Sequence, residues 1–121
     1  MSNQVILVDE NDNEIGIEEK LSAHKKKILH RAFSIFLFNK SSEILLQKRA
    51  PKKYHSGNLW TNTCCSHPIP NMPLKQSAKK RLVEEMGIHT ELTKVFSFIY
   101  DTEFTNGLYE YEYDHVLFGE F

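Results

Sequence analysis

The feature that most constrains the fold is a pair of β-like segments near the C-terminus, residues 95–100 and 108–118, which flank Thr105-Asn106-Gly107. An Asn-Gly pair between two such segments is a strong hairpin signal, because both residues accept the positive φ angles of a tight turn. The sequence therefore predicts two antiparallel strands here. Any fold for this chain must place them in a sheet.

Several further extended segments lie in the first half of the chain. Residues 5–8 and 15–17 read as short strands on either side of the turn signal Asn-Asp-Asn at residues 11–13, so they predict a second hairpin. Residues 32–38 are rich in aromatic and aliphatic side chains, which suits a buried strand. Residues 39–42 predict a turn that leads into residues 43–47.

One predicted helix separates these strands from the C-terminal hairpin. It can open at Pro73 and end at Gly87, which suits a C-terminal cap. Leu82 and Met86, with Ala78, share one face of it, and good helix formers fill the rest. The order of strands, helix and strands predicts a mixed α/β fold.

The composition is that of one globular domain over residues 1–121, with 40% hydrophobic and 26% charged residues. The longest apolar stretch, near residues 33–38, is far shorter than the ~20 residues that span a bilayer. The polar N-terminus is not a secretory signal, so we expect a cytoplasmic protein without a membrane partner. A net charge of -1 argues against a nucleic-acid partner. Cys64 and Cys65 are neighbours, and we expect free thiols because a disulfide between them would be strained.

Alternation in residues 109–114, Tyr-Glu-Tyr-Glu-Tyr-Asp, places Glu110, Glu112 and Asp114 on one face of a strand. Two interpretations stay open. The face is either solvated, with the tyrosines packed inward, or its charges are neutralised by a cation. Possible imidazole co-ligands are His24, His30 and His67. Such a mixed set suits Mn²⁺ or Zn²⁺ better than Mg²⁺, although a lone histidine is more often structural.

Cys65 and His67 stand two residues apart, so in extended backbone their side chains point to the same side. This would place a thiol beside a possible metal ligand. The alternative is a buried cysteine that packs as a small hydrophobe, an interpretation we keep for the oppositely directed Cys64. A thiol–histidine hydrolase is a third interpretation, but this spacing does not show a nucleophile correctly oriented toward its base.

Basic residues gather just before this motif, and they are Lys48, Arg49, Lys52 and Lys53. Together with Lys20 they could surround a diphosphate, since arginine offers a planar fork and lysine a compact charge. The alternative is ordinary solubility. In the helix, Glu84 and Glu85 are either surface partners of Lys80 and Arg81, four residues earlier, or ligands of a second cation.

Two of these motifs closely resemble those of the type 1 isopentenyl-diphosphate isomerases. Residues 61–68, Thr-Asn-Thr-Cys-Cys-Ser-His-Pro, resemble the cysteine motif of that family, and residues 109–112 resemble its paired-glutamate motif. His24 and His30 match the early metal-binding histidines of the family. The loop at residues 49–54 extends the similarity over nearly the whole chain.

The resemblance implies an isomerase that interconverts isopentenyl diphosphate and dimethylallyl diphosphate for isoprenoid biosynthesis, with Cys65 and Glu112 as acid–base pair and Tyr100 beside the glutamate. The implied ligands of one Mn²⁺ or Mg²⁺, which Zn²⁺ can replace on purification, are His24, His30, His67, Glu110 and Glu112. Glu85 is implied to help hold a Mg²⁺ that bridges to the diphosphate. The implied contacts of the diphosphate are Lys20, Arg49, Lys53 and Ser66. The oligomeric state stays open.

The family lies within the Nudix superfold, so the implied architecture is a mixed sheet with a flanking helix. The Nudix box, G-x5-E-x7-R-E-U-x-E-E-x-G-U, is kept only in its latter part at residues 80–88. Ser66 replaces its glycine and Met72 its first glutamate, which favours the isomerase over a Nudix-type diphosphohydrolase. Members of the family continue past Phe121 with further helices, so the resemblance implies a C-terminally truncated domain. A metal- or diphosphate-binding module without turnover is therefore a second alternative.

Overall fold

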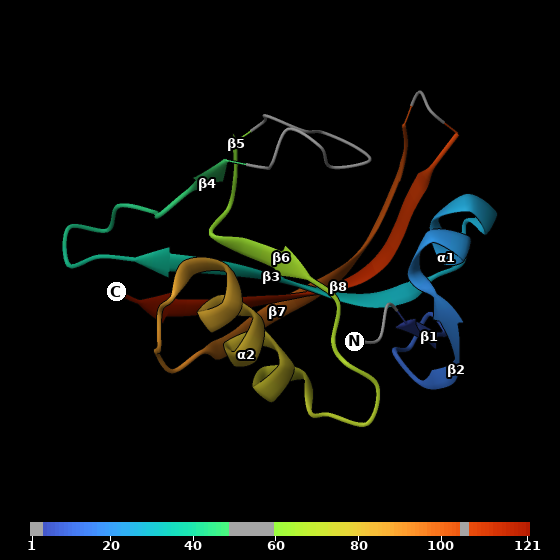
Figure 1. The fold of residues 1–121 in the computed structure, drawn as a ribbon, viewed down its shortest axis with the longest axis horizontal. Helices are drawn as coiled ribbons and strands as arrows, with labels where there is room; N and C mark the ends of the chain where they lie inside the picture. The colour runs from blue at the N-terminus through green and yellow to red at the C-terminus, as the bar shows by residue number, and fades with distance from the viewer. Residues whose placement is uncertain (1–3, 49–59, 105–106) are drawn as a thin grey trace.

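The computed structural model describes residues 4–48, 60–104 and 107–121, which form a mixed α/β fold (Figure 1). In chain order the elements are β1 (Gln4–Val8), β2 (Glu14–Glu19), α1 (Lys20–Lys26), β3 (His30–Phe38), β4 (Gln47–Lys48), β5 (Trp60–Thr61), β6 (Cys64–Ser66), α2 (Leu74–Met86), β7 (Thr93–Glu103) and β8 (Tyr109–Glu120). The predicted order of strands, helix and strands is confirmed, with α1 as an addition that the sequence pattern did not indicate.

The short helix α1 is fixed at both ends by local contacts. The Glu19 carboxylate accepts hydrogen bonds from the backbone N–H groups of Leu21 and Ser22, as an N-cap does. At the other end Lys27 adopts the left-handed conformation, with φ of 54°. A helix of seven residues is too short to show a clear hydrophobic period, which is why it was missed. Its importance is that it carries His24.

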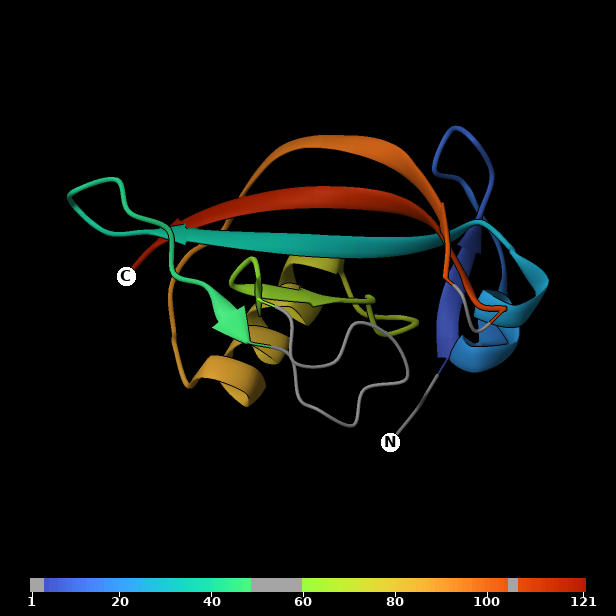
Figure 2. The same ribbon diagram turned by 90° about the horizontal axis from the view of Figure 1, so that it is seen from above.

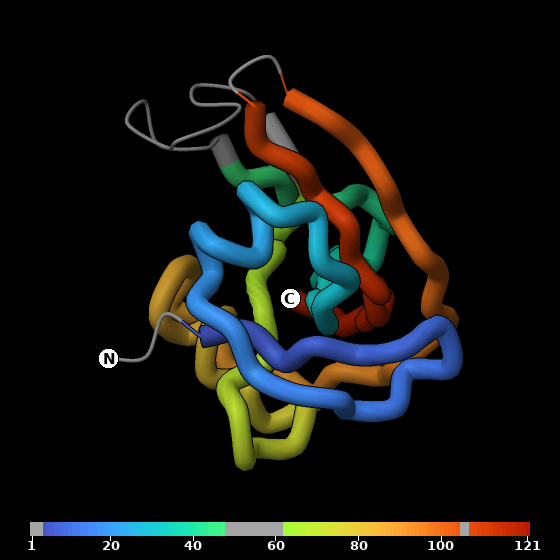
Figure 3. The backbone as a smooth tube through the Cα atoms, turned by 90° about the vertical axis from the view of Figure 1, so that its right-hand side faces the viewer, coloured from blue at the N-terminus to red at the C-terminus, as the bar shows by residue number. Residues whose placement is uncertain are grey.

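The main sheet of the described residues has the order β2-β1-β3-β8-β7, with β6 paired to β3. β3 and β8 are parallel, and the register starts with His30 opposite Glu112. Parallel strands need a long crossover connection, and this one contains β4, β5, β6, α2 and β7. Figure 2 shows β7, β8 and β3 running side by side with α2 on one side of them. Figure 3 shows the N-terminal hairpin and α1 together at the end of the sheet where β3 begins.

Both predicted hairpins are present as antiparallel strand pairs. β7 and β8 pair from Thr93–Phe118 to Glu103–Tyr109, while the predicted turn residues 105–106 lie outside the described ranges. β1 and β2 pair around a turn in which Asp12 has φ of 64°. The turn predicted at residues 39–42 is confirmed, since the side chain of Asn39 accepts from the backbone of residues 41 and 43. The segment that follows makes one isolated bridge, between Phe38 and Ile44, before β4 begins.

α2 packs its apolar face against one side of the sheet and forms the larger core. Its buried residues are Phe33, Ile35, Leu37, Cys64, Ala78, Leu82, Leu92 and Leu117. The predicted helix face is confirmed, since Ala78 and Leu82 are fully buried, Met86 packs against the cluster, and Gly87 ends the helix with φ of 67°. Each large side chain buried this way contributes about 1.5–3 kcal/mol. Neither helix of the described ranges combines the length and apolarity that crossing a bilayer requires.

Candidate functional site

Three histidines and one glutamate converge at the end of the sheet where β3 begins. His24 comes from α1, His30 from the start of β3, Glu112 from β8, and His67 follows β6 directly. One ligand atom from each lies within 4.8 Å of those of the other three. His24 and His30 are fully buried and Glu112 is 8% exposed. The parallel register of β3 and β8 creates the group, because it sets His30 opposite Glu112.

The imidazole of His30 is oriented for an interaction through Nε2. Its Nδ1 lies 2.8 Å from the backbone oxygen of Ile28, which can only accept, so Nδ1 carries the proton. In the neutral ring Nε2 is then an acceptor, and it lies 3.5 Å from Oε2 of Glu112. Nε2 of His67 lies 3.0 Å from the same oxygen. A backbone carbonyl that fixes the tautomer in this way is typical of histidines that bind metals.

Burial and crowding keep the imidazoles of His24 and His67 neutral. Burial lowers the pKa of His24 to about 3, and the neighbouring His67 and His30 act in the same direction. Burial also lowers the pKa of His67. Burial alone would raise the pKa of Glu112, but its two imidazole neighbours, His30 and His67, outweigh it and hold that pKa well below its usual range. Neutral imidazoles and an ionised carboxylate are the protonation states that bind a divalent cation, so this group can hold one.

Two other predicted ligands do not belong to this group of four. Glu110 is half-buried on the same face of β8, two residues before Glu112, and its strand partner is Thr102. Glu85 lies on α2, where its carboxylate accepts from Arg81 and Gln47. Their roles as metal ligands stay predictions.

Cys65 and Cys64 lie on opposite faces of β6, as the sequence predicts. Cys65 pairs with Ser34 across β3 and β6, and its Sγ lies 2.8 Å from Oδ1 of Asn62. Although the residue is exposed, enclosure of the sulfur by protein raises the pKa of the Cys65 thiol to about 11. The nearby charges of Asp114 and Glu112 act in the same direction. The thiol therefore stays protonated near neutral pH.

Tyr100 and Asp114 complete this face of the sheet. Tyr100 on β7 is the strand partner of Glu112, which places the two side chains on one side. Asp114 is 8% exposed and accepts a hydrogen bond of 2.9 Å from Oγ of Ser34. Burial raises the pKa of Asp114 to about 6. The burial of Glu112 and Asp114 excludes a solvated face as the explanation of the alternating pattern.

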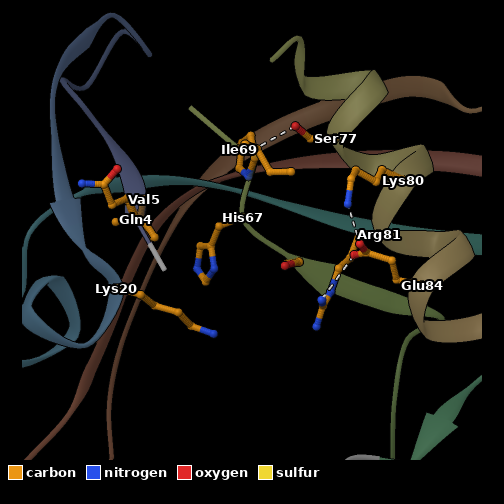
Figure 4. Close-up of a pocket in the computed structure, with 11 residues that line it drawn as sticks. Gln4, Val5, Lys20, His67, Ile69, Ser77, Lys80, Arg81 and Glu84 are labelled. Atoms are coloured by element: carbon orange, nitrogen blue, oxygen red, sulfur yellow. Dashed lines mark hydrogen bonds and ion pairs between the residues drawn. The ribbon is translucent and has the colours of Figure 1, made fainter. Parts of the chain in front are cut away.

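A basic pocket of about 180 Å³ opens beside His67 (Figure 4). Its lining includes Lys20 and Ser66, both predicted to contact a diphosphate, and also Lys80 and Arg81 from α2. Figure 4 shows Lys20 on one side of His67 and Arg81 on the other. The sequence pattern assigned Lys80 and Arg81 only to pairs with Glu84 and Glu85, and those ion pairs are present. Their place in the pocket follows from how α2 packs, which no local signal reveals.

The predicted diphosphate contacts Arg49 and Lys53 lie outside the described residues. They stay predictions from the composition of the loop.

The family model for the NUDIX domain matches residues 28–121, so the chain is a NUDIX-domain protein. The solved structure of DR0079 from Deinococcus radiodurans has the same fold, with a TM-score of 0.76 at 15% identity over 98% of this chain and 72% of that one. The MutT protein of Methanosarcina mazei gives a TM-score of 0.62 at 18% identity, over 77% of this chain and 64% of that one.

Proteins related in sequence indicate which family of NUDIX-domain proteins this chain belongs to. Isopentenyl-diphosphate Delta-isomerase 2 of Aromatoleum aromaticum is 57% identical over 98% of this chain and 63% of its own length. Isopentenyl-diphosphate Delta-isomerase 2 of Photorhabdus laumondii is 53% identical over 100% of this chain and 68% of its own length. The chain belongs to the isopentenyl-diphosphate Delta-isomerase family, and it spans about two thirds of the length of these relatives.

Proposed function

We propose that the chain interconverts isopentenyl diphosphate and dimethylallyl diphosphate. The observation that carries the proposal is a chain of neighbours: the charge of Glu112 acts on the Cys65 thiol, Glu112 contacts His67, and His67 lines a basic pocket. An alkene isomerase that acts on a diphosphate needs two proton-transfer groups and a cationic cradle, and this site offers both. The relatives that match nearly all of this chain carry the name of this activity.

The proposed cation site consists of His24, His30, His67 and Glu112, with Glu110 as a further ligand. Its mixture of imidazole nitrogens and carboxylate oxygens suits Mn²⁺, with Mg²⁺ as the alternative and Zn²⁺ as a substitute on purification. A bound cation supplies positive charge that sets the proton affinity of Glu112. Independently of it, His67 orients this carboxylate through the 3.0 Å contact of its Nε2 with Oε2.

The diphosphate is proposed to bind in the basic pocket. Lys20 and Ser66 line it, and Arg81 adds a planar fork that matches paired phosphate oxygens. Arg49 and Lys53 are proposed as further contacts from the preceding loop. Glu85 is proposed to help hold a Mg²⁺ that accompanies the diphosphate. The partner is thus a small isoprenoid diphosphate, and the proposed compartment is the cytoplasm.

The reaction shifts a double bond without net consumption of protons. One group gives a proton to the terminal alkene carbon, and the other removes a proton from the allylic carbon two positions away. We assign these roles to Cys65 and Glu112. Tyr100 lies beside Glu112, where its hydroxyl can hold the carboxylate and its ring can stabilise positive charge on the hydrocarbon.

The rival activity is diphosphate hydrolysis, which would rely on carboxylates of α2. In the described residues, Glu85 is engaged by Arg81 and Gln47, and Glu84 by Lys80. The incomplete Nudix box, with Ser66 and Met72 at two of its positions, favours isomerisation.

The test is turnover of isopentenyl diphosphate in heavy water with Mn²⁺ and Mg²⁺ present. We expect deuterium in dimethylallyl diphosphate, no released phosphate, and bound metal that survives dialysis. Phosphate release without isomerisation would establish the hydrolase instead. Tight diphosphate binding with neither product would establish a binding module.

A further inference from the structure

The side chain of Asn62, which lies between β5 and β6, has one assignable orientation. Its Nδ2 donates to the backbone oxygens of Ile35, at 2.8 Å, and Cys64, at 3.0 Å. Carbonyl oxygens can only accept, so the nitrogen of the amide must be the atom that faces them. Oδ1 is therefore the atom that faces Cys65, 2.8 Å from Sγ.

A second polar contact reaches the same sulfur from β3. Oγ of Ser34 lies 3.8 Å from Sγ of Cys65, and the hydroxyl hydrogen of Ser34 is donated to Oδ2 of Asp114. A hydroxyl has one hydrogen, so the oxygen of Ser34 can only accept from the thiol. Both neighbours thus present acceptors to Cys65, whose single S–H donates to one of them at a time, and the shorter contact is the one with Asn62.

We propose that Asn62 is a positioning residue for Cys65, and that Ser34, anchored by Asp114, is the second support. Together they hold the sulfur on the face of the sheet that carries Glu112. The inference rests on the proposed isomerase function, because the orientation of the Cys65 thiol matters only if this thiol transfers protons to or from the substrate. Catalytic groups lose efficiency steeply when displaced by about 1 Å, so a thiol without these supports would transfer protons poorly.

Thr63 offers a matched control, because it is the next residue and also ties this segment to its neighbours. Its Oγ1 accepts from the backbone N–H of Leu37 at 3.0 Å and donates to the backbone oxygen of Leu45. Like Asn62, it bridges segments through backbone groups. These two bonds do not involve the Cys65 thiol. Thr63→Val therefore measures the effect of losing contacts between segments while the contact of Asn62 with the thiol is kept.

The first test is steady-state kinetics of Asn62→Ala and Thr63→Val in the chain with its metal bound. For Asn62→Ala we expect kcat to fall about 10- to 100-fold while KM stays within about twofold, as for a misdirected catalytic group. Thr63→Val should unfold more easily but keep kcat. Equal kcat losses in the two variants, or an unchanged kcat in Asn62→Ala, would overturn the proposal.

The second test reads the thiol directly and does not need turnover. The infrared S–H band that disappears in Cys65→Ala belongs to Cys65. In Asn62→Ala this band should move to higher frequency, because the S–H group loses its strong acceptor, while Thr63→Val should leave it in place. An unmoved band in Asn62→Ala would refute the contact. If Asn62→Ala does not fold, Ser34→Ala should give a smaller shift in the same direction, and no shift would count against the proposal.

These two tests separate the proposed isomerase function from the proposed role of Asn62 in orienting Cys65. A wild-type chain that does not isomerise its substrate refutes the proposed function, while the infrared band still decides whether Asn62 orients the thiol.

Discussion

The two faces of β6 give adjacent cysteines opposite surroundings. Cys64 is fully buried among the apolar residues between the sheet and α2, and burial raises the pKa of its thiol. Cys65 faces Asn62 and Ser34, beside the buried carboxylates of β8. One short strand thus supplies both a core residue and a site residue. Stability and chemistry should therefore respond to different substitutions, even at neighbouring positions.

The largest expected contrast concerns the cysteines themselves. Cys65→Ser should lower isomerisation by about 10²- to 10⁴-fold, because a hydroxyl is a much weaker acid than a thiol. Cys64→Ser should keep kcat in the folded protein and lose stability instead. Deuterium incorporation in heavy water measures the first effect and urea unfolding the second. Equal kcat losses in both variants would mean that the two faces are not independent.

The next contrast compares the apolar core with the cation site. Leu82→Ala should lower the free energy of unfolding by about 2–5 kcal/mol, because it leaves a cavity under α2. The folded fraction should still bind metal normally. His30→Ala should instead weaken metal binding. Unfolding in the presence of a chelator and a metal titration measure the two effects, and a weakened metal affinity in Leu82→Ala would contradict the separation.

The smallest expected effect is a pH dependence on the polar face. In the metal-free protein, burial raises the pKa of Asp114 from 3.8 to about 6. A carboxyl with a raised pKa contributes stability at low pH that is lost as pH rises toward 6 and above, here at most about 3 kcal/mol. Asp114→Asn should flatten this part of the curve of unfolding free energy against pH. Parallel curves for the two proteins between pH 4 and 7 would exclude Asp114 as the source.

Local signals predicted much of this architecture. The Asn-Gly turn and the flanking strands predicted the C-terminal hairpin, and Gly87 predicted where α2 ends. Strand alternation also placed Glu112 and Asp114 on one face and separated Cys64 from Cys65. Each of these inferences depends on the period of a strand or on the conformation of one turn or cap, which neighbouring residues determine.

Features that depend on tertiary packing were not accessible in this way. The sequence holds no signal that β3 and β8 are parallel partners, yet this pairing sets His30 against Glu112. The pocket positions of Lys80 and Arg81 depend on the packing of α2. The contact of Asn62 with Cys65 depends on the bend before β6 and on the carbonyl of Ile35 in β3. The resemblance to a family supplied the proposed ligands and the proposed acid–base pair, but no role for Asn62.

The parallel pairing of β3 and β8 also bears on how the protein folds. Loop closure between residues so distant in sequence costs entropy before the contacts that repay it can form. His30 and Glu112 cannot meet until β8 has joined β3, which happens after every other strand and helix of the described chain has emerged from the ribosome. Tight binding of a metal ion would therefore report the pairing of β8 with β3. A nascent chain that ends before β8 would contain the three histidines of the group but would lack the Glu112 carboxylate.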